Sequence, residues 1–73
     1  MNKLSNFVKN QRKDMACTQE EYAPMIGISV PTLVKIENGK KVGLATCKKL
    51  ADIYKLPTKL IRRMMLNEDY EQE

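Results

Sequence analysis

Histidine and tryptophan are absent from the 73 residues of this chain, and cysteine occurs only twice, at Cys17 and Cys47. Without histidine there is no imidazole general base, no Cys–His nucleophile pair and no Cys/His zinc finger. We therefore expect no enzymatic activity, no metal site and no cofactor. Two isolated thiols are typical of a reducing compartment, so we expect both cysteines to be reduced and packed as small apolar side chains.

Long apolar runs are also missing. No stretch approaches the roughly 20 residues that a membrane-spanning helix needs, and residues 1–10 lack the apolar core of a signal peptide. These absences predict a cytoplasmic protein with no membrane partner. The length predicts one domain, and the hydrophobic fraction of 42% is sufficient for a small core but not for a deep substrate pocket.

Glycine and proline each occur only three times, and no apolar alternation indicates a strand. Apolar residues instead recur at helical spacing, as in the first segment with Leu4, Phe7, Val8, Gln11 and Met15 on one face. The sequence thus predicts an all-α, single compact five-helix domain over residues 1–66. The expected helices cover residues 2–14, 19–26, 30–37, 44–54 and 57–66, and residues 67–73 form an acidic segment that we expect to fray.

Helix-end signals surround the second and third of these segments. Thr18 and Glu21 have the spacing of a capping box, and Gly27 is suited to end the helix that follows. Ser29 is a good N-cap for the next helix, with Pro31 in its first turn. Pro24 falls inside the second helix, where we expect it to produce a kink.

Two short helices joined by residues 27–29 have the length of a helix-turn-helix, whose second helix enters the DNA major groove. The residues that support this interpretation are Gln19, Ala23, Gly27, Ile28, Ser29, Leu33, Ile36, Glu37, Asn38 and Gly39. Their order and spacing resemble the XRE family, the Cro and phage-repressor type, and the resemblance covers about residues 4–61. It implies a lambda-repressor-like fold that binds operator DNA, usually as a twofold dimer.

The third helix directs four residues away from its Leu33 and Ile36 face, and we predict that these read bases. They are Val30, Pro31, Thr32 and Lys35. Lys35 could donate to guanine, whereas Val30 and Pro31 could only pack on a thymine methyl or a sugar. The plainer alternatives are that Thr32 belongs to the helix cap and that Lys35 is a solvated charge.

Phosphate contacts are expected from helix N-termini and from the loop after the third helix. The candidates are Thr18, Gln19, Ser29, Asn38, Lys40 and Lys41. The resemblance implies such a role for Gln19 and Asn38 in particular, while Lys40 and Lys41 could simply be solvated. It also implies a structural salt bridge between Arg12 and Glu37, and it places Lys55 where the family often has glycine.

The fifth helix has more apolar side chains than its length requires. We assign Ile61, Met64, Met65 and Leu66 to a homodimer interface. The alternative is that Ile61 and one methionine complete the core of the monomer.

Charge is distributed unevenly. Residues 1–66 contain all 13 basic residues and five acidic ones, for a net charge of +8, whereas residues 67–73 carry −4. A basic body with these motifs predicts a sequence-specific double-stranded DNA-binding transcriptional regulator, most simply a repressor of a short pseudo-palindromic operator. The alternative is an antitoxin or partner-binding module with the same fold, whose second protein would be a toxin or an antirepressor.

Overall fold

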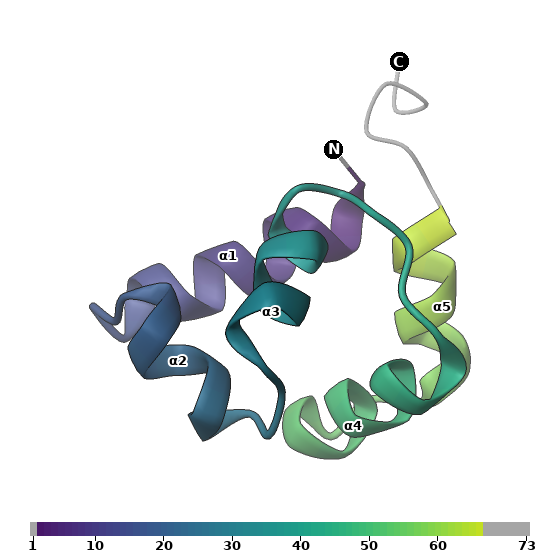
Figure 1. The fold of residues 1–73 in the computed structure, drawn as a ribbon. Coiled ribbons are helices and arrows are strands. Elements are labelled where there is room, and N and C mark those ends of the chain that lie inside the picture. The colour runs from purple at the N-terminus through teal and green to yellow at the C-terminus, as the bar shows by residue number, and fades with distance from the viewer. Residues whose placement is uncertain (1, 67–73) are drawn as a thin grey trace.

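A computed structural model describes residues 2–66 as five α helices in a closed arrangement (Figure 1). Their bounds are Lys3–Asp14 for α1, Gln19–Met25 for α2, Val30–Glu37 for α3, Leu44–Tyr54 for α4 and Thr58–Leu66 for α5. The predicted all-α, five-helix fold is confirmed, and three helix ends move by one residue. Residues 67–73, for which fraying was predicted, lie outside the described residues.

Three helices begin with a side-chain cap. The Asn2 carboxamide oxygen accepts from the Ser5 backbone N–H at 2.8 Å, which makes residue 2 the cap of α1 and not its first helical residue. Thr18 and Glu21 form the predicted capping box, with hydrogen bonds of 3.1 and 2.9 Å. Ser29 caps α3 by accepting from the Thr32 N–H at 3.2 Å. Each cap stabilises its helix by about 1 kcal/mol.

The helices enclose one apolar core. α1 packs on α3 and α5, α2 packs on α3, and α4 packs on α5. The buried apolar residues are Leu4, Val8, Tyr22, Ala23, Ile26, Leu33, Ile36, Cys47, Leu50, Ala51, Ile61 and Met65. Every helix therefore contributes apolar side chains to the core against which α2 and α3 pack.

The aromatic residues of the described chain all belong to this core. The hydroxyls of Tyr22 and Tyr54 lie 2.8 Å apart and are hydrogen-bonded. The Phe7 ring meets the Tyr54 ring edge-on, with centroids 5.0 Å apart. Burial raises the pKa of Tyr54, so this hydroxyl stays protonated at any ordinary pH. Residues 2–66 thus present no exposed aromatic ring on which a single-stranded base could stack.

The structure changes two expectations from the sequence and agrees with a third. Met15 is 51% exposed and is not on the buried face of α1, because the helix ends at Asp14 and residue 15 is its C-cap. Pro24 is the penultimate residue of α2, so the hydrogen bond it cannot make falls in the last turn and the helix ends a residue later. Both cysteines are free and pack against the core as predicted, Cys47 fully buried and Cys17 half-buried, and burial raises the pKa of Cys47.

The loop between α3 and α4 passes the start of α1 and then runs along α5 (Figure 1). The Asn2 side-chain amide donates to the Gly39 carbonyl oxygen at 3.1 Å, so the start of α1 holds the end of α3. The Val42 backbone N–H donates to the Met65 sulfur at 3.2 Å, so the last turn of α5 holds the middle of the loop. The loop consequently has a defined position although it contains no regular structure.

Four helices end on a residue in the left-handed conformation. Gly27 and Gly39 have φ angles of 76° and 82°, which glycine adopts without strain. Ala16 and Lys55 have φ angles of 55° and 57° at the equivalent positions after α1 and α4. A residue with a Cβ atom in this conformation costs about 1 kcal/mol or more. The sequence-based expectation that Lys55 occupies a turn suited to glycine agrees with this geometry.

We predict that Lys55→Gly stabilises the domain by about 0.5–1 kcal/mol, because the relief of strain exceeds the added entropy of the unfolded chain. Urea denaturation measures the change in the free energy of unfolding. Lys48→Gly, on the exposed face of the same helix, is the matched control and should destabilise the domain by a similar amount. Destabilisation by both substitutions would contradict the proposed strain.

Candidate nucleic-acid interface

A tight turn sets the relation between α2 and α3. The Ile28 N–H donates back to the Ala23 carbonyl oxygen at 3.1 Å, and the Gly27 N–H donates to the Pro24 carbonyl oxygen at 3.2 Å. Ala23 is completely buried, and its small side chain lets the two helices approach closely. Ser29 then starts α3 immediately, so α3 is held at a fixed angle to α2.

The surface of α3 divides into a buried and an outward face. Leu33 and Ile36 are buried in the core, whereas Pro31 and Lys35 are exposed. Among the predicted base-reading residues, Val30 is half-buried and packs against the core, so less of it faces outward than expected. Of the four, Pro31 and Lys35 have the most open positions.

The hydroxyl of Thr32 has a partner within the protein. Its oxygen lies 2.8 Å from the Ser29 hydroxyl oxygen, in addition to the capping bond from the Thr32 N–H. One of the two hydroxyls donates its proton to the other, and the proton of the accepting hydroxyl remains free to donate to a group outside the protein. Ser29 and Thr32 therefore act as one unit at the start of α3, combining the cap role with one free donor.

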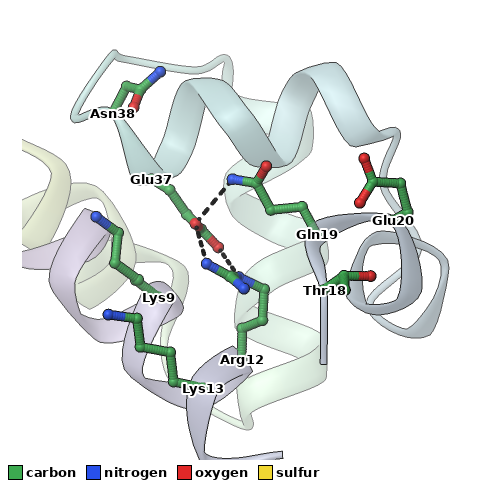
Figure 2. Close-up of a pocket in the computed structure, with 8 residues that line it drawn as sticks. All are labelled: Lys9, Arg12, Lys13, Thr18, Gln19, Glu20, Glu37 and Asn38. Atoms are coloured by element: carbon green, nitrogen blue, oxygen red, sulfur yellow. Dashed lines mark hydrogen bonds and ion pairs between the residues drawn. The ribbon is translucent and has the colours of Figure 1, made fainter. Parts of the chain in front are cut away.

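A buried carboxylate joins α1, α2 and α3. Glu37 is 2% exposed and receives hydrogen bonds from Arg12 Nε at 2.8 Å, Arg12 Nη2 at 3.0 Å and Gln19 Nε2 at 3.0 Å (Figure 2). Arg12 Nη1 also donates to the Cys17 carbonyl oxygen at 3.0 Å. Arg12 and Glu37 thus form the ion pair that the family resemblance implied. Gln19, a predicted phosphate contact, uses one side-chain amide proton in its bond to Glu37, and its second amide proton remains available to another acceptor.

These bonds decide the ionisation of Glu37. Burial alone would raise the pKa of this carboxyl group, but the hydrogen bonds from Arg12 and Gln19 outweigh it and hold the pKa below its ordinary value. The bond to Glu37 in turn raises the pKa of Arg12. Both groups are charged at neutral pH, so the pair contributes no net charge to the surface around it.

An open polar pocket of about 520 Å³ lies over this pair (Figure 2). Its lining residues are Lys9, Arg12, Lys13, Thr18, Gln19, Glu20, Glu37 and Asn38. Three elements meet there, namely one side of α1, the start of α2 and the end of α3. The three predicted phosphate contacts Thr18, Gln19 and Asn38 are therefore brought to one place. Ser29 lies at the start of α3, and Lys40 and Lys41 are exposed in the loop beyond Asn38.

Sequence reasoning missed Lys9 and Lys13, which line the same pocket from α1. They are four residues apart and so share one side of the helix with Arg12 close by (Figure 2). Because Glu37 neutralises Arg12, these two lysines supply the positive charge on the α1 side. The four-residue spacing within a predicted helix was the signal available in the sequence, but only the fold shows that this side borders α2.

The predicted dimer residues separate into two groups. Ile61 is completely buried and Met65 is 5% exposed, so both complete the core of the monomer and are not available to a second copy. Met64 is half-buried, and Leu66 is 49% exposed. This corrects the interface prediction, of which only Met64 and Leu66 remain as surface candidates.

The turn geometry, the outward face of α3 and the polar pocket beside it define a helix-turn-helix DNA-binding domain. A scan against protein-family models matches the helix-turn-helix family over residues 8–61, so the chain belongs to this family, in its XRE type. Searches among curated proteins and among solved structures return no match. Within residues 2–66, no helix is long and apolar enough to cross a bilayer, and no cluster of acidic or cysteine side chains is arranged to hold a metal ion.

We predict that Arg12→Ala destabilises the domain by about 3–5 kcal/mol at neutral pH, because it leaves the Glu37 charge buried without its main partner. Lys13→Ala, exposed on the same helix, should change the free energy of unfolding by less than about 0.5 kcal/mol. Equal small effects of both substitutions would show that the buried pair does not contribute to stability.

We predict that the loss of stability caused by Arg12→Ala becomes smaller at acid pH. In the native chain the lowered pKa of Glu37 stabilises the fold above its ordinary value of 4.5, and this contribution is lost as pH falls. In the Arg12→Ala variant, only Gln19 still bonds to Glu37, and we expect burial to outweigh this bond and raise the pKa of Glu37. Protonation of Glu37 in acid then removes the cost of burying an unpaired charge. Urea denaturation of both chains between about pH 7 and about pH 3.5 measures the difference. A constant difference would contradict this role of Glu37.

Proposed function

We propose that this DNA-binding helix-turn-helix regulator is a repressor that reads a short pseudo-palindromic operator as a homodimer. The observation that carries the proposal is the outward face of α3, whose C-terminal end adjoins both the polar pocket and the exposed basic loop at Lys40 and Lys41. In this arrangement α3 enters the major groove, and the pocket and the loop meet the sugar-phosphate backbone. The chain then acts by occupying DNA that a polymerase needs.

Base reading falls mainly to Lys35. Its exposed ammonium group donates to guanine O6 or N7, the acceptors that distinguish G·C in the major groove. Pro31 offers only apolar contact, which suits a thymine methyl group. The Ser29–Thr32 pair adds one hydroxyl donor, which bonds to several bases and so discriminates weakly.

Backbone anchoring comes from the polar pocket and from the loop after α3. In the pocket, Lys9 and Lys13 face a phosphate together with Thr18, the second amide proton of Gln19, and Asn38. In the loop, Lys40 and Lys41 face a further phosphate. Within the pocket, Glu37 bonds Arg12 and Gln19 and so holds the Gln19 side chain in position. Such contacts set register and affinity without selecting sequence.

We predict that lysine substitutions have two different effects on DNA binding, depending on whether the lysine contacts phosphate or a base. Lys13→Ala and Lys40→Ala should weaken binding to all duplexes alike and reduce the slope of log affinity against log salt by about 0.9 each, since each removes one phosphate contact. Lys35→Ala should relax base preference at one position by about 1–3 kcal/mol. Site selection from random duplexes, followed by anisotropy titration over a range of salt, measures both effects.

Lys59→Ala, which removes the same charge from the exposed surface of α5, serves as the control and should leave the slope nearly unchanged. Equal affinity of the native chain for every duplex would rule out operator reading. If Lys59→Ala reduced the slope of log affinity against log salt as much as Lys40→Ala does, net charge alone would govern binding.

The dimer is expected to use Met64 and Leu66, with selected half-sites about 10–10.5 bp apart from centre to centre. Leu66→Ser should then weaken self-association, because it removes exposed apolar surface, while leaving the fold intact. Sedimentation velocity of the native and variant chains, with and without operator DNA, measures this. A native chain that sediments as a monomer in both conditions would exclude the homodimer.

A further inference from the structure

We propose that the acidic segment 67–73 binds within its own chain to the basic loop at Lys40 and Lys41, where it competes with DNA phosphate. The proposal rests on the DNA-binding role argued above for that loop. Its first support is a contact between elements distant in sequence: the Val42 N–H donates to the Met65 sulfur at 3.2 Å. Lys41 immediately precedes Val42, and residue 67 follows Met65 by two positions. The last described turn of α5 therefore lies beside the basic loop.

Chain length allows the contact for every carboxylate of the segment. An extended chain spans at most about 3.3–3.6 Å per residue, so Glu68 has a reach of about 10 Å from Met65 and Glu73 about 28 Å. The Lys41 backbone is one residue from the atom that touches Met65. The length of the segment is therefore sufficient for its carboxylates to reach the loop that carries Lys40 and Lys41.

Charge complementarity gives the second support. Residues 67–73 contain Glu68, Asp69, Glu71 and Glu73 and no basic residue. Residues 38–51 contain no acidic residue, and the exposed Lys40 and Lys41 form no ion pair within the described part of the chain. The nearest carboxylate along the chain, Glu37, is buried and already paired with Arg12. The loop charges are thus open to a carboxylate from outside residues 2–66.

Attachment through a short linker makes this competition effective. A group tethered by a few residues acts at an effective concentration in the millimolar range, without any contribution from a second molecule. DNA phosphate must displace the carboxylates before it reaches the loop, so the segment lowers affinity for any duplex. The effect weakens with salt, since exposed charges are screened beyond about 10 Å at 0.1 M ionic strength.

The test is a variant that keeps length and removes charge: Glu68→Gln, Asp69→Asn, Glu71→Gln and Glu73→Gln together. Anisotropy titration with a duplex of random sequence at low salt should show binding about 10-fold tighter than that of the native chain. In a background of Lys40→Ala and Lys41→Ala, the same neutralisation should gain less than about 2-fold. In a background of Lys13→Ala, which removes a lysine of the pocket on α1, the full gain should remain.

An equal gain in all three backgrounds would show that the segment acts only by general repulsion of DNA, and no gain would show that it does not act at all. Either result overturns the proposal. A measurement without DNA separates this failure from that of the proposed function. Neutralising the segment should shift the NMR amide signals of Lys40 and Lys41 but not that of Lys13, and the shift should be unchanged on dilution. Absence of this shift overturns the contact, whereas a shift in a chain that binds no duplex refutes the DNA-binding proposal alone.

Discussion

The buried carboxylate of Glu37 is the constraint on which the rest of the binding surface depends. A charge at this depth is stable only when its hydrogen-bonding capacity is met, and the required donors come from α1 and α2. The end of α3, one side of α1 and the start of α2 are therefore tied to a single point. The polar pocket lies above that point, whereas the angle between α2 and α3 is set by the turn at Gly27 and Ile28.

Much of the fold could be predicted from local chemistry. The caps at Thr18 and Ser29 and the turn glycine at residue 27 each act within a few residues, so the sequence shows where helices begin and end. Apolar spacing likewise identifies which face of each helix is buried. The error at Met15 arose because periodicity continues past the point where the backbone leaves the helix. The outward positions of Pro31 and Lys35 followed from the same spacing.

The rest of the site depends on which elements meet, and that information is not local. Lys9 and Lys13 border the pocket only because α1 packs across α3 beside the start of α2. Ile61 and Met65 look like an interface in the sequence of an amphipathic helix, yet α1 and α4 cover them in the fold. The hydrogen bond between the Ser29 and Thr32 hydroxyls at the start of α3 depends on side-chain orientations that the sequence does not specify.

The two bonds that hold the loop between α3 and α4 also have a consequence for how affinity can change. A binding loop fixed before it meets its ligand loses little conformational entropy on binding, which is the advantage of preorganisation. In the proposed complex with DNA, that advantage comes from Asn2 and Met65, which lie near opposite ends of the described chain. Under this proposal, substitutions at either residue alter the entropy of association while every side chain proposed to face the duplex stays the same. The strength of binding could then change separately from the choice of sequence.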